Sequence, residues 1–372
     1  MKAYLTYFGY FAWLIILWYI SVRRPEWVTK KERINDKTVT RYNWVFALLA
    51  LVPLVYFASM RGKYFGDTGM YWRGFQDAPS SFSEISEYIA KLKKDKAFYV
   101  SVAILRCILG NRPVVYLGVV AIIQLLLLGK TLRKYSSNFL ISLFIFVAST
   151  DYIAYMYNGI RQFVAVVIIF ASSRLIFEKK YLLTIIIIWI ASLFHQSALL
   201  MIPIVFIVQG KPWNKSTVMM LFLTFLAIIY VNQFTTILDN MLEETQYTNV
   251  VSEWIAWKDD GTNPFRVAVY CVPAVLSLIG LQYIREENDP VINICTNMSV
   301  ISAGLYLISM ATSGLFMGRL PIYVCLYSNC ILLPWEIDHF FNKGSIRIIR
   351  LAMIACFMFF YIYLIHFSWG LV

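Results

Sequence analysis

The chain of 372 residues is 60% hydrophobic and only 15% charged, with a formal net charge of +12. An ordinary soluble domain carries about a quarter charged residues, so this composition excludes a soluble globular fold and indicates a membrane protein. Basic loops beside anionic lipid explain the positive charge, and no nucleic-acid-binding module is present to suggest another partner.

Nearly charge-free apolar stretches recur along the chain, and several approach the ~20 residues that a membrane-spanning helix needs. Their continuous apolar runs lack the alternation of barrel strands, so the predicted fold class is all-α. The predicted spans lie near 3–22, 43–60, 113–129, 138–157, 160–177, 181–195, 197–209, 217–236, 264–284, 291–312, 316–335 and 351–369. The sequence therefore predicts a polytopic protein of about 12 transmembrane helices, some short or re-entrant, in a single multi-pass membrane domain over residues 1–372.

The positions of Lys and Arg set the orientation, because cytoplasmic loops retain positive residues. If the loop 23–42 is cytoplasmic, the inner loops hold 19 of the 33 Lys and Arg residues. The two largest outer loops are then 61–112 and 237–263, and both termini face outward. The basic residues of 61–112 do not oppose this orientation, because long loops translocate with little regard to charge.

Motifs for several common chemistries do not occur in the sequence. It has no P-loop, no dinucleotide-binding glycine turn, no HExxH and no GxSxG. The six cysteines form no close pair of the kind used for zinc or redox chemistry. We therefore expect no cofactor and no metal ion.

Three arginines share one position, at the outer start of a predicted span: Arg161, Arg266 and Arg319. A helix N-terminus has free N–H groups and partial positive charge, and a guanidinium binds phosphate oxygens in pairs, so a diphosphate suits this set. The alternative is an arginine that only reaches the membrane interface with its long stem. Gly159 and Gly318 favour the binding site at Arg161 and Arg319, because they allow close backbone approach.

Other polar residues mark candidate chemistry at the same outer ends. His195 lies at the tip of a helical hairpin, where it suits a general base or a residue that orders the turn. Asp67 and Tyr71 follow the second span, and Asp67 also suits an Asx-turn. Asp151 falls within the fourth span, where a carboxylate faces the bundle interior or a water-filled cavity, for catalysis or for an ion pair.

One stretch of the sequence, about 158–203, carries a denser pattern. Its residues are Asn158, Gly159, Ile160, Arg161, Gln162, Ala165, Glu178, Lys179, Lys180, Ala191, Phe194, His195, Ser197, Ala198 and Pro203. This pattern resembles the EpsG-type group of bacterial exopolysaccharide polymerases, relatives of the Wzy polymerases. Gly66 and Asp67 with Tyr71, and Arg319 with Tyr323, resemble the flanking motifs of that family, although its usual GxDxxxY has one residue between the first Gly and the Asp.

The resemblance implies a GT-C-like membrane glycosyltransferase in the bacterial cytoplasmic membrane, with its active site on the extracytoplasmic face. The implied reaction moves an oligosaccharide from undecaprenyl diphosphate onto the next lipid-linked repeat unit, without metal or nucleotide sugar, for an exopolysaccharide of a biofilm or capsule. The implied partners are the lipid-linked donor and acceptor and the membrane lipids, with a flippase and a chain-length regulator as further candidates.

The candidate residues then divide by role. For the diphosphate we assign Arg161 and Arg319, with Arg266 as a weaker third, because fixed guanidinium groups stabilise the charge of the leaving group. For the base we assign His195 first and Asp67 second. Substrate contacts are expected from Gln162, Tyr71 and Asp151.

Two other classes of protein remain open. A transporter or flippase of lipid-linked sugars would also place arginines beside a cavity, but no inverted repeat or matching pair of broken helices is visible. A membrane O-acyltransferase also uses a lone histidine, but deep in a tunnel beside an asparagine, whereas His195 lies at a hairpin tip. Clustering of the polar set at one membrane face favours an enzyme, and distribution through the midplane favours a transporter.

Overall fold

The computed structural model describes residues 2–34, 37–242, 261–314, 316–342 and 344–368. It divides into two compact units. The first contains Met1–Ile176, Lys180–Leu199 and Arg347–Val372, and the second contains Phe177–Lys179 and Leu200–Ile346. Most of the predicted outer loop 237–263, residues 243–260, lies outside the described residues.

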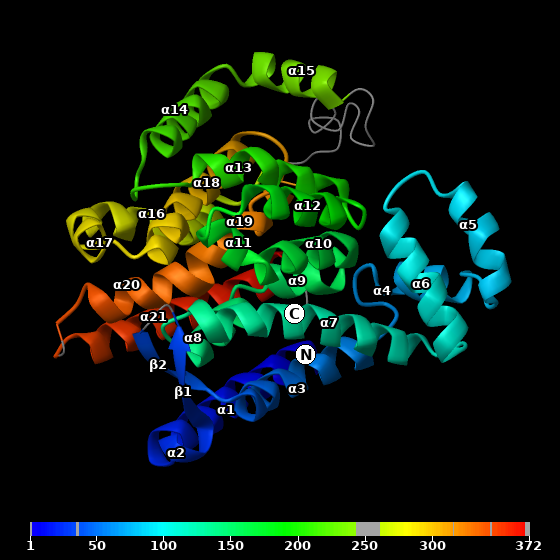
Figure 1. Cartoon of the computed structure of the whole chain (residues 1–372), viewed down its shortest axis with the longest axis horizontal. Helices are drawn as coiled ribbons and strands as arrows, with labels where there is room; N and C mark the ends of the chain where they lie inside the picture. The colour runs from blue at the N-terminus through cyan, green and yellow to red at the C-terminus, as the bar shows by residue number, and fades with distance from the viewer. Residues whose placement is uncertain (1, 35–36, 243–260, 315, 343, 369–372) are drawn as a thin grey trace. The chain divides into compact units, whose positions relative to one another are not determined.

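The first unit consists of helices and one β-hairpin (Figure 1). Its elements are α1 (Lys2–Arg23), α2 (Pro25–Val28), β1 (Thr29–Ile34), β2 (Lys37–Tyr42), α3 (Trp44–Met60), α4 (Thr68–Gln76), a 3-10 turn (Phe82–Glu84), α5 (Ile85–Lys91), α6 (Lys96–Leu109), α7 (Pro113–Tyr135), α8 (Phe139–Ala148), α9 (Asp151–Tyr157), α10 (Ile160–Ala171), α11 (Ser173–Phe177), α12 (Tyr181–Ser192), the 3-10 helix η2 (Gln196–Leu200), α21 (Ile346–Tyr363) and the π-helical turn η6 (Leu364–Ser368). Helices α11, η2 and α21 cross the boundary between the units by one residue each.

Side-chain caps fix the starts of several predicted spans. The Asn43 side chain accepts a hydrogen bond from the N–H of Phe46 at 2.8 Å and begins α3. Asn138 begins α8 in the same way, through the N–H of Ile141 at 3.2 Å. Pro113 occupies the first position of α7, where its missing N–H costs nothing. These starts agree with the predicted spans 43–60, 138–157 and 113–129.

Helices α3 and α7 pack antiparallel through two glycines. A Cβ added to Gly118 would lie 3.3 Å from Cβ of Ser59, and one added to Gly129 would lie 2.7 Å from a methyl group of Leu51. Helix α10 lies along α7 on another side, where the Thr131 hydroxyl donates to the carbonyl of Phe170 at 2.9 Å. Helix α7 is therefore the central helix of the unit.

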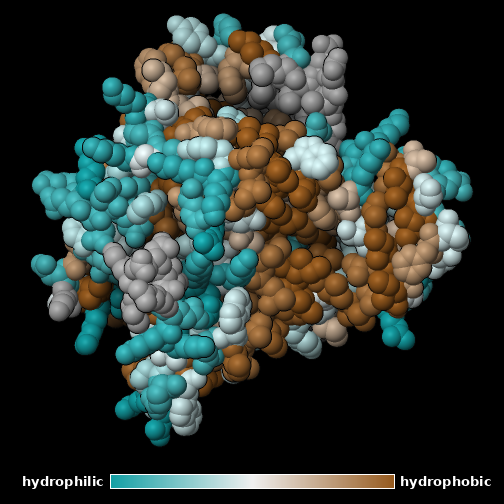
Figure 2. All heavy atoms as spheres, in the orientation of Figure 1, coloured by the Kyte–Doolittle hydropathy of each residue, from teal (hydrophilic) through white to brown (hydrophobic). Residues whose placement is uncertain are grey.

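A β-hairpin occupies most of the loop predicted at 23–42, which corrects the all-α prediction for this segment. Strands β1 and β2 pair antiparallel, from Thr29 opposite Tyr42 to Ile34 opposite Lys37. The hairpin docks on the end of α7, where Arg133 donates to the carbonyl of Tyr42 at 2.6 Å and forms an ion pair with Glu32. Figure 2 shows hydrophilic residues over α2 and the hairpin, and hydrophobic residues over the face formed by α3 and α7.

The predicted outer loop 61–112 is itself largely helical, and it packs on the opposite end of α7. The rings of Phe75 in α4 and Tyr116 in α7 stack at 4.5 Å, in a buried cluster that also contains Phe98 and Val102 of α6. The hairpin and the α4 to α6 segment therefore contact α7 at points about 26 Å apart along its axis, at Arg133 and Tyr116.

The second unit is helical throughout its described residues. Its elements are α13 (Met201–Ile207), α14 (Lys215–Ile229), α15 (Val231–Leu242), α16 (Pro264–Ile279), α17 (Leu281–Glu287), α18 (Pro290–Ala311), the 3-10 helix η4 (Met317–Arg319), α19 (Ile322–Tyr327), the π-helix η5 (Ser328–Leu332) and α20 (Leu333–His339). The buried helix α18 contacts α14, α16 and α19. Its Asn297 side chain donates to the carbonyls of Val208 and Lys211, which fixes the chain after α13.

The run from α19 through η5 to α20 is one buried helical rod with a π-helical turn in its middle. Pro334 follows this turn and has no N–H to donate to the carbonyl of Cys330, four residues earlier. Local π-helical adjustment is one way in which a membrane helix accommodates proline.

Four helices in the described residues are long and apolar enough to span a membrane: Pro113–Tyr135, Pro290–Ala311, Met317–His339 and Ile346–Phe367. The number rises to seven if each bent pair counts as one span. These pairs bend by 76° between α8 and α9, 105° between α14 and α15, and 69° between α16 and α17. A multi-pass helical membrane protein is thus confirmed, whereas the 12 spans and the GT-C-like fold stay predictions.

Candidate functional site

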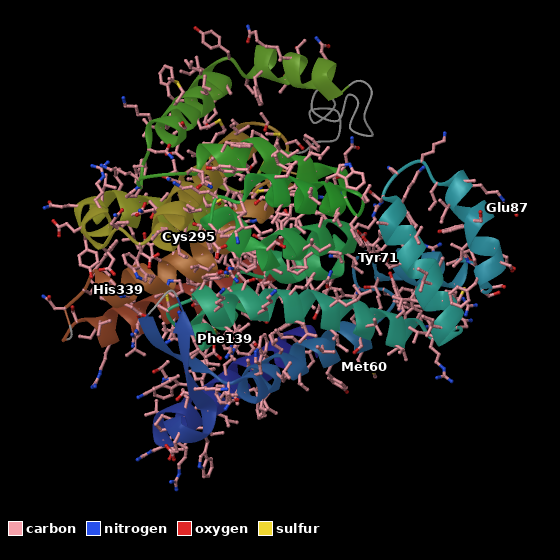
Figure 3. All side chains as sticks on the ribbon, viewed as in Figure 1. Met60, Tyr71, Glu87, Phe139, Cys295 and His339 are labelled. Carbon is pink, nitrogen blue, oxygen red and sulfur yellow. The ribbon has the colours of Figure 1, made fainter. Side chains whose placement is uncertain are left out.

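The first unit holds six of the predicted site residues: Asp67, Tyr71, Asp151, Arg161, Gln162 and His195. They lie at or just before the start of α4, on α9 and α10, and in the turn after α12. Figure 3 shows Tyr71 near α4 and the start of α10. The other two, Arg266 and Arg319, belong to the second unit.

Arg161 is the second residue of α10 and forms an ion pair inside the first unit. Its Nη1 lies 2.5 Å from Oδ2 of Asp95 and donates to the Tyr99 hydroxyl at 3.4 Å. The Arg161 side chain is 24% exposed, whereas the Asp95 side chain is only 1% exposed. The structure therefore holds this guanidinium at the start of a helix, against a buried carboxylate.

Asp95 is a site residue that the sequence analysis missed. It precedes α6 with a left-handed backbone, φ 51°, and its Oδ1 is buried without a hydrogen-bond partner in the described part of the chain. Burial raises the pKa of Asp95, and the neighbouring Arg161 opposes that shift. In the sequence it stands between Lys94 and Lys96, a pattern typical of a solvated surface, so no signal marked it.

Two separate motifs of the sequence meet at Asn158. The Tyr71 hydroxyl donates to the backbone carbonyl of Asn158 at 2.9 Å, and the N–H of Asp67 donates to the side-chain Oδ1 of Asn158 at 3.2 Å. Gly66 has φ 49°, and a Cβ there would lie 2.2 Å from the same Oδ1. The motif around Asp67 thus packs directly against the loop that starts α10.

The carboxylate of Asp67 and the hydroxyl of Tyr71 differ in environment. Asp67 precedes α4 as an exposed residue and makes no side-chain cap bond. Tyr71 is buried: burial raises the pKa of its hydroxyl, and the nearby Arg161 lowers it. Tyr71 therefore lies in the same polar group as Arg161.

Arg61 is a second cation at this end of the unit that sequence reasoning missed. It follows α3 directly, and Figure 3 labels its neighbour Met60 at the end of that helix. Its Nε donates to the Thr68 hydroxyl at 3.0 Å, its Nη1 donates to the carbonyl of Ala58 at 2.6 Å, and its guanidinium lies 4.7 Å from the ring centroid of Tyr157. Burial lowers the pKa of Arg61.

His195 lies in the turn between α12 and η2, as the sequence predicted. Its Nδ1 lies 2.7 Å from the Ser197 hydroxyl, and the side chain of Gln162 donates to the same hydroxyl at 3.4 Å. The N–H of Ala97 donates to the carbonyl of Leu193 at 3.1 Å, which joins this turn to the start of α6. His195 and Gln162 are therefore linked through Ser197, beside the segment that carries Asp95.

Asp151 lies within the fourth predicted span, just after the point where that span bends. The fourth predicted span is broken at Ser149 and Thr150, and buried Asp151 begins α9 after the break. The other end of α9 leads into Asn158. Asp151 thus lies one short helix away from the point where the motifs meet.

In the second unit, Arg266 and Arg319 lie on two segments that contact each other. Arg266 is the third residue of α16, as predicted, whereas exposed Arg319 ends η4, three residues before α19 begins. Thr262, just before α16, has its hydroxyl 2.7 Å from the position of a Cβ on Gly318. Gly318 therefore allows the close approach of Thr262, and its expected role at an anion site stays a prediction.

The first unit thus provides two guanidinium groups, a buried carboxylate and a histidine paired with a serine, which suit anion binding and proton transfer. No group of three or more His, Cys, Asp or Glu residues that could hold a metal ion occurs within the described residues. Fold and site together define a multi-pass helical membrane protein with a cation-rich polar site.

A sequence model of the EpsG family matches residues 44–370, so the chain belongs to the EpsG family. The predicted resemblance is confirmed. No curated protein and no solved structure matches the chain. Membership of this family suggests an exopolysaccharide polymerase in general, and so a membrane enzyme of the glycosyltransferase type.

Proposed function

We propose that the protein polymerises lipid-linked oligosaccharide repeat units by metal-independent glycosyl transfer on the extracytoplasmic face of the bacterial cytoplasmic membrane. The donor is an oligosaccharide on undecaprenyl diphosphate. One observation carries the proposal: Arg161 is fixed at the N-terminus of α10 beside Asp95, where the Asp67 to Tyr71 motif packs on Asn158.

The chemistry needs a stabilised leaving group. An acceptor hydroxyl forms a bond to the anomeric carbon of the donor, the bond to the diphosphate breaks, and the electron pair of that bond stays on the diphosphate oxygen. A guanidinium fixed at a helix N-terminus stabilises this charge. We assign this role to Arg161, and in the second unit to Arg319 with Arg266 as a weaker third.

The acceptor proton needs a base. We assign it to His195, because the Ser197 hydroxyl at 2.7 Å orients its imidazole. Asp67 is the second candidate, since its carboxylate is exposed and makes no cap bond. Gln162 and Tyr71 are assigned to substrate binding from their positions beside His195 and Arg161. Asp151 remains a weaker candidate for substrate contact.

The experiment compares conservative arginine variants in cells. Arg161→Lys and Arg319→Lys keep the charge but lose the planar fork that binds phosphate oxygens in pairs. Mass spectrometry of extracted lipid-linked intermediates is expected to show accumulated single repeat units and no long polymer, at equal protein level. Arg73→Lys is the matched control, because Arg73 lies exposed on α4. A wild-type polymer distribution in both variants would contradict the proposal that these arginines bind the donor diphosphate.

A further inference from the structure

Arg61 is a half-buried cation without an acidic partner among the described residues. Ion pairs in that part of the chain join Arg24 to Glu26, Lys91 to Glu87, Arg133 to Glu32 and Arg161 to Asp95, and none of these four includes Arg61. Arg61 instead packs on the ring of Tyr157 and donates to two neutral oxygens. Arg61 is half-buried, and a positive charge that is partly removed from water favours an acidic partner, so an anion would complete this arrangement.

One nitrogen of Arg61 has no role in the fold. Nε is bonded to Thr68 and Nη1 to Ala58, whereas Nη2 is buried and has no hydrogen-bond partner in the described structure. Buried donors are nearly always paired, and a guanidinium nitrogen pairs best with a carboxylate or phosphate oxygen.

Arg61 and Arg161 contact neighbouring positions on one helix face. Arg61 is bonded to Thr68 of α4, and Arg161 lies beside the hydroxyl of Tyr71 of the same helix. Residues three apart in a helix have Cβ atoms about 5–6 Å from each other. Both guanidinium groups therefore converge on the same short stretch of α4, within reach of one ligand that carries two phosphoryl groups.

We propose that Arg61 is a second diphosphate-binding residue, which binds one phosphoryl group through Nη2 while Arg161 binds the other. The inference rests on the proposed function, in which a lipid diphosphate is the donor, and it identifies the two-phosphoryl headgroup as the feature recognised in the first unit. Tyr157 and Thr68 orient the guanidinium of Arg61, as Asp95 orients that of Arg161.

The test measures selectivity between diphosphate and monophosphate with the purified full-length protein in nanodiscs. The probes are undecaprenyl diphosphate, undecaprenyl phosphate and inorganic pyrophosphate, each titrated by calorimetry. Wild type is expected to prefer the lipid diphosphate over the lipid monophosphate by about tenfold or more. Arg61→Lys is expected to bind the two lipids alike, because Lys lacks the fork, and Arg73→Lys is expected to keep the preference. Binding of pyrophosphate in place of the lipid would show that the phosphoryl groups alone are recognised.

Each outcome has a distinct meaning. If wild type shows no preference for the diphosphate, the proposed function fails together with this inference. If wild type and Arg61→Lys show the same preference, only the role of Arg61 is overturned, and its contact with Tyr157 is purely structural. The thermal unfolding midpoint of each variant is measured alongside. If Arg61→Lys does not fold, Thr68→Val serves as the second variant: it removes the acceptor of Nε at similar volume and is expected to reduce the preference, and an unchanged preference overturns the proposal.

Discussion

At the scale of single residues, Asn158 connects parts of the chain that are about 90 residues apart in sequence. Its backbone carbonyl accepts from Tyr71 and its side chain accepts from the N–H of Asp67. Because its carbonyl oxygen and its side-chain oxygen both accept hydrogen bonds, Asn158 fixes the start of α10. It thereby also fixes the position of Arg161, three residues later. The geometry of the site thus depends on a residue without acid–base chemistry of its own.

Gly66→Ala tests this connection. The new Cβ would lie 2.2 Å from Oδ1 of Asn158, and alanine disfavours the φ of 49° at this position. We expect a loss of about 1–3 kcal/mol in stability and a strong loss of polymer formation. Gly62→Ala is the control, because nothing lies within 4 Å of a Cβ there. Equal thermal unfolding midpoints for the two variants would contradict the expectation.

His195→Ala is expected to leave the protein folded and to slow polymer formation by about 10²–10⁴-fold, if His195 is the general base. Ser197→Ala removes the hydroxyl that orients the imidazole, so a smaller loss is expected. Polymer yield from membranes with equal protein content provides the measurement. Near-normal yield from His195→Ala would show that His195 only orders the turn and is not the general base.

Asp95→Asn is expected to change how stability depends on pH. Because burial raises the pKa of Asp95, the native state binds its proton more tightly than the unfolded chain does. The stability from this group is therefore present below the ordinary pKa of about 3.9 and is lost as pH rises through the raised native pKa. As pH rises through this range, the thermal unfolding midpoint of Asp95→Asn should therefore fall less than that of wild type. Asp77→Asn, at the exposed end of α4, is the control, and identical profiles for wild type and Asp95→Asn would refute the expectation.

At the scale of elements, the sequence predicted what depends on apolar runs and caps, and missed what depends on polar contacts. The sequence predicted the starts of α3 and α8, because Asn43 and Asn138 each lie where a polar loop ends and an apolar run begins. The hairpin did not, because its strands are basic and lack alternating apolar residues. Its docking depends on contacts with Arg133, about 100 residues away, which hydropathy does not report.

The same distinction holds within the site. Arg161 and His195 were recognisable because they belong to a dense motif. Arg61 and Asp95 were not, because in the sequence each looks like an ordinary charge in a polar loop, and only the fold buries Asp95 and partly buries Arg61. Only the tertiary packing of α3, α4 and α6 gives these two residues their environment.

Arg133→Met tests the docking of the hairpin. The Arg133 side chain is 7% exposed, so its loss removes a mostly buried ion pair and a hydrogen bond to Tyr42. We expect a loss of about 1–3 kcal/mol, after allowance for the partial exposure of Glu32. Amide hydrogen exchange should accelerate in β1 and β2 while α4 stays protected. Unchanged protection of the hairpin would show that other contacts hold it.

At the scale of the whole molecule, the orientation in the membrane remains a prediction with a specific test. The hairpin and the α4 to α6 segment lie at opposite ends of α7, a helix long and apolar enough to span a membrane. Lys30→Cys and Glu87→Cys, both at exposed positions, are introduced singly after replacement of the six native cysteines. In intact cells an impermeant thiol reagent is expected to modify position 87 and not position 30. The reverse pattern would invert the orientation.

The π-helical turn at Ser328–Leu332 has a consequence for how this chain is aligned with related sequences. A π-helical turn holds one residue more than the α-helical turn it replaces, so it marks an insertion of one residue in the helical rod. In a chain that lacked this residue, an ordinary α-helical turn would replace the π-helical turn, and the residues after it would keep their faces of the rod. Trp335 and Glu336, both buried here, would then keep the same side of the rod. A gap of one residue in an alignment therefore belongs within Ser328–Leu332, because a gap elsewhere in the rod would rotate the residues that follow it by about 100° around the helix axis.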